Sequence, residues 1–306
     1  MAYDGRIMQR ALARFDEDKQ RRGAQLEQRR RTAYARAPRL AEIDTELRGT
    51  MSRIISSALA RGTDPLPAIR VLRDENLQLQ RERVQLLASL GYPADWLEEK
   101  PACAQCGDTG YVQGGVCPCL RAYYAREQLA ELSRLLPLGE DSFETFSFDW
   151  YDSTVQPAFG VSPRENMERN FDVCRDYAYQ FDRGGGNLLL SGGTGLGKTF
   201  LSACIARVVS ENGFSVVYDT AASVFSRFED AKFRRDDGGS EDADRCMKCD
   251  LLILDDLGTE MTTAFVQSAL YQIVNGRLME KRATIISTNL APEEIGSRYG
   301  RSVLSR

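Results

Sequence analysis

The segment Asn187-Leu-Leu-Leu-Ser191 is followed directly by Gly192, Gly193, Thr194, Gly195, Leu196, Gly197, Lys198 and Thr199. The second part fits G-x-x-x-x-G-K-[ST] without a mismatch, and a helix-period apolar run from Phe200 to Val209 follows it. A strand, a glycine-rich loop and a helix in this order are typical of phosphate-binding loops. The glycines let backbone N–H groups surround a phosphate, and the helix N-terminus adds its dipole. The sequence therefore predicts a nucleotide-binding segment over 192–200.

Two side chains of this segment have predicted roles of their own. Lys198 is placed to bridge the β- and γ-phosphate oxygens, and the hydroxyl of Thr199 is placed to hold Mg2+. These roles require a carboxylate from a second strand.

That carboxylate is predicted in Asp250-Leu-Leu-Ile-Leu-Asp255-Asp256, an aliphatic strand that ends in two acids. Asp255 is placed to hold Mg2+ through water, and Asp256 to polarise the water that attacks the γ-phosphate. Two acids at a strand end can also cap a loop, but this explanation is weak beside a phosphate-binding loop.

A further strand, Ala283 to Thr288, ends in Asn289. The carboxyl ends of parallel strands converge at one ligand crevice, so Asn289 is placed to orient the attacking water. Simple turn chemistry before Pro292 explains this residue equally well. Strand-like runs at 187–191, 215–219, 251–255 and 283–288 alternate with helical segments, which predicts an α/β fold with a parallel sheet.

The amino-acid composition excludes several classes of protein and of catalytic site. The chain has 306 residues, of which 42% are apolar and 27% charged, so it can bury a core. It has no histidine, which excludes Ser-His-Asp triads, histidine bases and histidine metal ligands. Its longest purely aliphatic run is Leu251 to Leu254, and its start lacks an apolar signal sequence, so we expect a cytoplasmic protein with no membrane span.

The N-terminal region is basic and helical. Residues 1–61 hold 14 Lys and Arg against 8 Asp and Glu, whereas the remainder holds 26 against 36. Acidic residues interrupt the basic run, which favours a solvated helix face with pairs such as Glu17–Arg21 over a nucleic-acid footprint. Apolar residues at three-four spacing from Leu40 and again from Leu66 predict two helices, separated by a stop and cap at 62–65. We expect residues 1–98 to form a helical domain that packs on itself or docks on a partner protein.

A cysteine-rich segment follows. Cys103, Cys106, Cys117 and Cys119 have the spacing C-x2-C-x10-C-x-C, with a hairpin expected through Gly114-Gly115. Four thiolates suit a closed structural zinc site, although a redox dithiol or an iron–sulfur cluster competes with it. The other four cysteines are interpreted as buried small hydrophobes. The expected organisation is a zinc module over 99–124, a connector over 125–160 and a nucleotide-binding core over 161–306.

Four of these motifs together resemble the DnaC/DnaI family of AAA+ helicase-loader ATPases and its relative, the transposition helper IstB. They are Gly-Gly-Thr-Gly-Leu-Gly-Lys-Thr, Leu-Leu-Ile-Leu-Asp-Asp-Leu-Gly-Thr-Glu, Ile-Ile-Ser-Thr-Asn-Leu and Tyr-Gly-Arg-Ser-Val-Leu-Ser-Arg. The cysteine segment is similar to the zinc module of the Gram-positive loader subgroup. The resemblance covers residues 100–306.

The resemblance implies functions for the residues that match. Residues 192–199 would be Walker A, Asp255 and Asp256 Walker B, and Asn289 sensor 1. Arg306 stands at the position of an arginine finger, which acts on ATP in a neighbouring subunit and so implies self-association. The family's function would be to bind the replicative DNA helicase through the N-terminal domain and deliver it onto single-stranded DNA.

The sequence departs from the family after Arg306, where a fifth strand and a sensor-2 arginine would follow. We therefore expect a truncated chain in which the phosphate-loop strand has an exposed edge, and ATP turnover by this chain is in doubt. The chain also differs from the family at Ser302, a position where some relatives have arginine. Single-stranded DNA binding is a possible role for Lys232, Phe233, Arg234 and Arg235, which a solvated helix end also explains. The alternatives are an IstB-like transposition ATPase, a non-hydrolysing ATP-dependent adaptor and, least favoured, a P-loop kinase.

Overall fold

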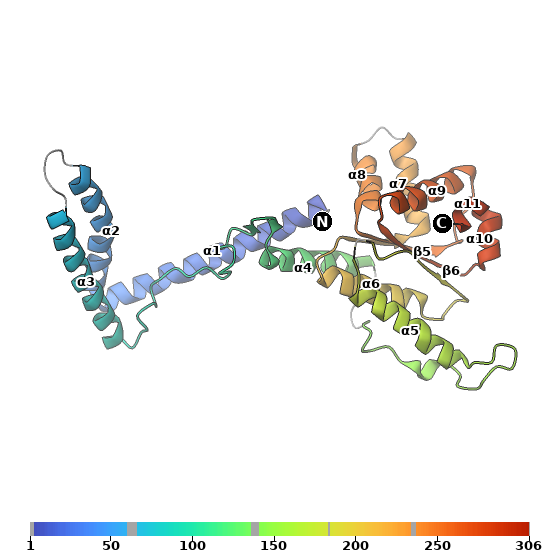
Figure 1. The fold of residues 1–306 in the computed structure, drawn as a ribbon, viewed down its shortest axis with the longest axis horizontal. Helices are drawn as coiled ribbons and strands as arrows, with labels where there is room; N and C mark the ends of the chain where they lie inside the picture. The colour runs from blue at the N-terminus through green and yellow to red at the C-terminus, as the bar shows by residue number, and fades with distance from the viewer. Residues whose placement is uncertain (1–2, 60–65, 136–140, 183, 234–236, 306) are drawn as a thin grey trace. The chain divides into compact units, whose positions relative to one another are not determined.

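The computed structural model describes the chain except for residues 1–2, 60–65, 136–140, 183, 234–236 and 306. The residues pack into two units (Figure 1). The core unit comprises Met1–Arg14 and Gly110–Arg306, and the helical unit comprises Phe15–Thr109. Helix α1 (Gly5–Arg36) contributes residues to both units. The domain boundaries expected after residues 98, 124 and 160 stay predictions.

The helical unit contains the rest of α1, α2 (Pro38–Leu59) and α3 (Leu66–Ser89). The helices predicted from Leu40 and from Leu66 are therefore confirmed, whereas the stop and cap predicted at 62–65 lie outside the described residues. The small apolar core of the unit consists of Ala33, Leu40, Leu87 and Leu97.

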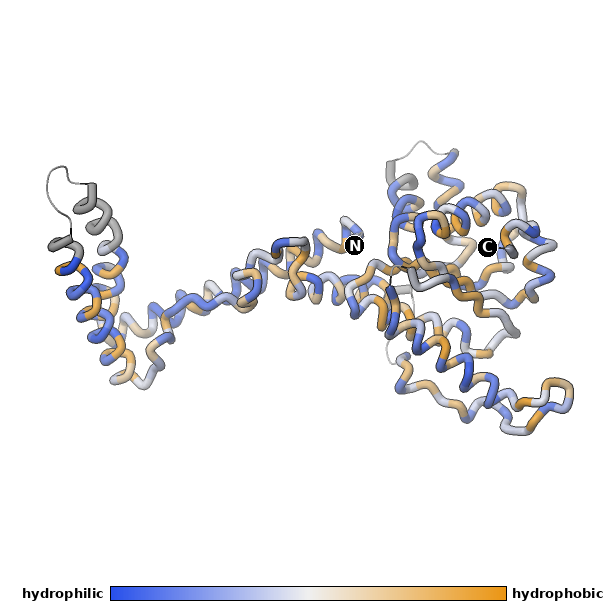
Figure 2. The backbone as a smooth tube through the Cα atoms, viewed as in Figure 1, coloured by the Kyte–Doolittle hydropathy of each residue, from blue (hydrophilic) through white to orange (hydrophobic). Residues whose placement is uncertain are grey.

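The surface of α1 is mostly hydrophilic (Figure 2). Arg21 pairs with Asp18 at 2.5 Å and not with the predicted Glu17, and Arg30 pairs with Glu27 at 2.6 Å. Local pairs of this kind support the interpretation of the basic run as a solvated helix face.

A four-stranded parallel sheet forms the centre of the core unit. Its strand order is β3-β6-β5-β4. The strands are β3 (Leu188–Ser191), β4 (Val216–Thr220), β5 (Leu251–Leu257) and β6 (Ala283–Thr288). All four lie where the apolar runs predicted them, and the predicted α/β fold with a parallel sheet is confirmed.

Helices cover both faces of this sheet, as an all-parallel sheet requires. Alternate residues of β5 point to opposite faces, so Leu251 and Ile253 belong to one apolar cluster and Leu252 and Leu254 to the other. The first face is covered by α4 (Pro118–Leu135), α5 (Pro163–Tyr179) and α6 (Lys198–Glu211). The second is covered by α7 (Ala221–Phe233), α8 (Asp237–Lys248), α9 (Ala264–Met279), α10 (Pro292–Tyr299) and α11 (Arg301–Leu304).

The two edges of the sheet differ. At β4, Val216 N donates to Gln128 Oε1 at 3.0 Å, and Gln128 Nε2 donates to Phe214 O at 2.7 Å, so α4 covers this edge with one amide. Strand β3 is the other edge among the described strands, because it pairs with β6 alone there. This agrees with the exposed edge predicted for the phosphate-loop strand.

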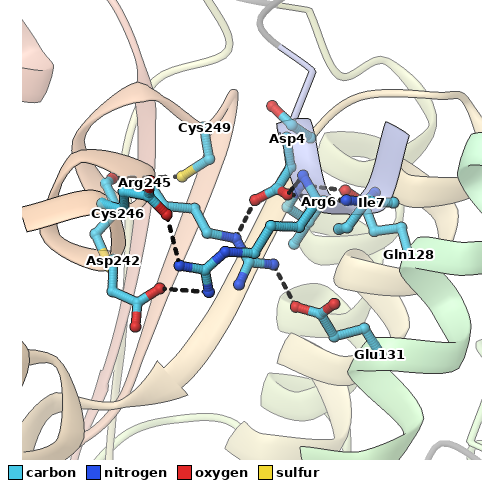
Figure 3. Close-up of polar contacts among 12 residues, drawn as sticks. Asp4, Arg6, Ile7, Gln128, Glu131, Asp242, Arg245, Cys246 and Cys249 are labelled. Atoms are coloured by element: carbon cyan, nitrogen blue, oxygen red, sulfur yellow. Dashed lines mark hydrogen bonds and ion pairs between the residues drawn. The ribbon is translucent and has the colours of Figure 1, made fainter. Parts of the chain in front are cut away.

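Charged side chains at and just before the start of α1 anchor this segment in the core unit, and several of them are drawn in Figure 3. Asp4 pairs with Arg245 of α8, which also pairs with Glu131 of α4. Arg6 contacts Asp242 of α8 at 3.1 Å, and Arg10 pairs with Glu131. We call this group the N-terminal clasp; it ties the start of α1 to α4 and α8.

None of the helices in the described ranges combines the length and the apolar character that a membrane crossing requires.

Candidate nucleotide site

The phosphate-binding loop lies between the end of β3 and the start of α6, and its tight path depends on glycine. Gly197, directly before α6, has a φ of +82°, where a side chain is strained. A Cβ there would lie 2.9 Å from Tyr151 Oη, which donates to Leu196 O at 3.2 Å. Any larger residue at this position would therefore displace the loop.

Lys198 lies across this loop. Its Nζ donates to Gly192 O and Gly193 O, each at 2.8 Å, and to Asn289 Oδ1 at 2.7 Å. The contact with Asn289 joins the loop to the end of β6. The structure thus brings together a lysine and an amide that the sequence placed 91 residues apart.

Thr199 and Asp255 also meet. The Thr199 hydroxyl donates to Asp255 Oδ2 at 3.2 Å, and Asp255 is 4% exposed. A hydroxyl and a carboxylate oxygen are hard donors of the kind that Mg2+ prefers. The two residues expected to hold Mg2+ therefore form one oxygen-rich corner beside the phosphate loop.

Two further side chains hold Asp255 in place, and sequence analysis missed both. The Tyr218 hydroxyl of β4 donates to Asp255 Oδ2, and the Ser287 hydroxyl of β6 donates to Oδ1. Burial, together with the Asp255 carboxylate, raises the pKa of Tyr218, so its hydroxyl stays a donor at neutral pH. The sequence does not single them out, because β4 and β6 each contain further polar residues beside Tyr218 and Ser287.

Asp256 has an unusual backbone. Its φ is +54°, and the register between β5 and β6 shifts between Leu254 and Leu257. Strain and bulges of this kind concentrate at functional sites, where they re-aim a side chain. Asp256 N donates to Ser287 Oγ at 3.0 Å, while no described residue is hydrogen-bonded to its carboxylate.

The remaining predicted site residues lie apart from this group or outside the structure. The ring centres of Phe200 and Phe146 lie 5.3 Å apart, and both rings are half-buried against the apolar core. Arg306 lies outside the described residues.

The basic group predicted for DNA binding is described only in part. Lys232 Nζ lies 5.4 Å from the ring centre of Phe265. Arg234 and Arg235 lie outside the described residues, as does the side chain of Phe233.

The four cysteines of the predicted zinc module gather at one point. The sulfur atoms of Cys103, Cys106, Cys117 and Cys119 all lie within 4.8 Å of one another. A tetrahedral zinc site with Zn–S distances of about 2.3 Å has sulfur atoms about 3.8 Å apart, so these thiols fit the ion. The predicted hairpin through Gly114-Gly115 is confirmed by strands β1 (Tyr111–Val112) and β2 (Gly115–Val116). The structure therefore has a four-cysteine cluster.

The other four cysteines, Cys174, Cys204, Cys246 and Cys249, are buried, as expected. Burial raises the pKa of Cys174 to about 11 and that of Cys246 to about 12. Both therefore remain neutral thiols at physiological pH.

Arg277 is fully buried, and sequence analysis did not single it out. Its guanidinium donates to Thr284 Oγ1 at 3.0 Å and to Cys246 O at 2.7 Å. It also contacts Cys249 O and Sγ and the first residue of β6, Ala283. Arg277 thus satisfies the carbonyl groups where α8 ends and where two strands begin.

Comparisons with known proteins agree with this site. Residues 174–306 match the family model described as IstB-like ATP binding protein. The matched residues begin within α5 and include all four strands of the parallel sheet. The match includes Lys198, Asp255 and Asn289, so the predicted IstB/DnaC resemblance is supported for this segment. It begins after the four cysteines, and the Gram-positive zinc subgroup stays a prediction.

One curated relative is the replicative helicase loader DnaC of Escherichia coli (strain K12). It is 31% identical over 144 residues, which are 46% of this chain and 58% of that protein. The aligned part thus spans less than two thirds of the relative's length. Among solved structures, the DnaC helicase loader is 20% identical with a TM-score of 0.43, covering 53% of this chain and 92% of that one. DnaI is 18% identical with a TM-score of 0.44, covering 55% of this chain and 84% of that one.

Proposed function

We propose that this chain is an ATP-binding replication protein that binds the replicative DNA helicase and loads it onto single-stranded DNA. The observation that carries the nucleotide part is the meeting of Lys198, Thr199, Asp255 and Asn289 at one end of the sheet. Similarity to DnaC over 144 residues supports the loader part.

In this proposal, backbone N–H groups of 192–199 bind the phosphates of ATP, and Lys198 leaves its loop carbonyls to bridge the β- and γ-phosphates. Thr199 and Asp255 hold Mg2+, which neutralises charge on the phosphates. Asp256 polarises the attacking water, and Asn289 orients it. Hydrolysis is slow and acts as a switch between states of the loader.

Partner contacts are assigned to other parts of the chain. Residues 1–98 bind the helicase, and Arg306 acts on ATP in a neighbouring copy of the chain. Cys103, Cys106, Cys117 and Cys119 hold a structural zinc ion, which their mutual distances support.

A second candidate is an IstB-like transposition helper, whose partner is a transposase. The family model that matches residues 174–306 favours it, because its description names IstB. The four-cysteine cluster favours the loader, since it resembles the loader zinc module. In a third candidate, ATP is bound without being hydrolysed and the chain acts as an adaptor.

Size-exclusion chromatography of the full chain with the replicative helicase of the same organism tests the proposal. We expect a complex that depends on ATP and Mg2+ and is weakened by Lys198→Ala. Lys248→Ala is the matched control, because Lys248 is an exposed lysine of α8. If no complex forms with or without nucleotide, the loader function is wrong. If the complex forms but the bound ATP is not hydrolysed, the adaptor function is favoured.

A further inference from the structure

Asp256 lies near the end of β5, and the backbone there and in the turn that follows has a strained conformation. Asp256 has a φ of +54° and Gly258 a φ of +110°, both in the region that side chains disfavour. A Cβ on Gly258 would lie 2.7 Å from Leu290 Cδ1. Contacts that hold the turn after β5 therefore help to keep Asp256, at the end of this strand, in place.

Two side chains hold both backbone groups of Gly258. Its N–H donates to Glu260 Oε2 at 3.0 Å, and its carbonyl accepts from Arg298 Nη1 at 3.0 Å. Arg298 belongs to α10, which lies far along the chain from this loop. The turn after Asp256 is thus fixed from two sides.

Glu260 is held in turn by α10. Its Oε1 accepts a hydrogen bond from the Tyr299 hydroxyl, and Tyr299 is 3% exposed. Burial, reinforced by Glu260, raises the pKa of Tyr299, so the hydroxyl remains a donor. Gln267 of α9 donates to Arg298 O at 2.7 Å and ties α9 to the same point.

We propose that Glu260, Arg298 and Tyr299 form a clamp that positions Asp256 for ATP hydrolysis. None of the three has a hydrogen bond or ion pair with Lys198 or Thr199 in the described structure, so they are positioning residues and not phosphate ligands. The clamp rests on the proposed ATPase function. We expect that mutation of these side chains slows ATP hydrolysis and leaves nucleotide binding intact.

The test measures steady-state ATP turnover and nucleotide affinity of the full chain. Tyr299→Phe removes only the hydroxyl, and we expect kcat to fall at least about tenfold with Kd for ATP within about twofold, because small misplacements are costly in catalysis. Arg298→Ala changes an exposed residue and should do the same without a folding risk. Tyr271→Phe, which removes a hydroxyl from α9 without a hydrogen bond in the described structure, should leave kcat unchanged.

The double variant Glu260→Gln/Tyr299→Phe gives a further check. Because the two side chains act through one hydrogen bond, their effects on kcat should fall short of additive. Additive effects would contradict a shared clamp.

Asp256→Asn separates failure of the clamp from failure of the proposed function. If Asp256→Asn abolishes turnover while Tyr299→Phe and Arg298→Ala keep wild-type kcat, the clamp is wrong and the ATPase stands. An equal loss of kcat and of ATP affinity would show a general structural defect and also overturn the clamp. A wild-type chain that binds ATP without turnover would overturn both.

Discussion

At the scale of single residues, three hydroxyl groups from different elements hold the carboxylate of Asp255. It accepts hydrogen bonds from Thr199 of α6, Tyr218 of β4 and Ser287 of β6. Donors from three elements leave the carboxylate one orientation, with its charge directed at the phosphate loop. Partners of this kind tune metal binding almost as strongly as the ligands themselves.

We therefore expect Tyr218→Phe and Ser287→Ala each to raise the Mg2+ concentration required for half-maximal ATP binding by about tenfold. Titration of Mg2+ against binding of a fluorescent ATP analogue measures this. Ser202→Ala is the control, since Ser202 is a buried hydroxyl with no hydrogen-bond partner among the described residues. An unchanged Mg2+ requirement in both variants would contradict the support role.

A second prediction at this scale concerns the contribution of Arg277 to stability. Replacing it with methionine leaves several buried carbonyl groups without donors, each of which costs about 1 to 3 kcal/mol. Arg277→Met should lower the free energy of unfolding by at least about 3 kcal/mol, measured by urea unfolding. Arg169→Met, at an exposed ion pair with Glu165, should cost about 1 kcal/mol or less. Equal effects would refute the role of Arg277.

At the scale of elements, the local patterns predicted the strands but not all of the site. The loop 192–199 and the two acids near the end of β5 follow from short motifs, because each depends on neighbours in the chain. Tyr218 and Ser287 reach Asp255 only through the register of three strands, and the positive φ of Asp256 arises from a bulge. Register and bulges depend on tertiary packing, so no local pattern reveals them.

The N-terminal clasp predicts a pH dependence. Burial disfavours the charged form of Glu131, but hydrogen bonds from Arg10 and Arg245 outweigh it and lower its pKa. Because the pKa of Glu131 is lower in the folded state than in the unfolded state, its charged form stabilises the fold at pH values above the unfolded-state pKa of about 4.3. This contribution is lost as the pH falls through the folded-state pKa. Glu131→Gln should therefore lower stability by about 1 to 2 kcal/mol at pH 7.

Urea unfolding at pH 7, 5 and 3.5 checks this prediction. The difference between wild type and Glu131→Gln should persist at pH 5 and shrink at pH 3.5. Glu168→Gln, at an exposed pair with Arg164, is the control and should show little difference at any of these values. A Glu131→Gln difference that grows on acidification would contradict the clasp.

The four-cysteine cluster predicts one zinc ion for each chain. Because a structural site needs all four thiolates, Cys106→Ala should lose most of the metal, measured by elemental analysis of the purified protein. Cys174→Ala alters a buried cysteine outside the cluster and should retain it. Iron in place of zinc, or equal zinc in both variants, would disprove this assignment.

At the scale of the whole molecule, the chain combines a helical unit, whose helices carry no predicted chemistry, and a core unit with a candidate nucleotide site. The sequence predicts helices in the first hundred residues and nucleotide-binding motifs after residue 187, and the functions assigned to these two parts stay predictions. A loader requires both properties: a surface for the helicase and an ATP-dependent state that controls its release.

Helicase loading onto a circular single strand tests this account most directly, because such DNA offers no free end at which a helicase could enter without a loader. The measurement is displacement of an annealed oligonucleotide by the replicative helicase of the same organism. The account predicts that this chain, with ATP and Mg2+, increases displacement, and that Lys198→Ala does so far less than Lys248→Ala. Displacement that stays at the level of the helicase alone would contradict it.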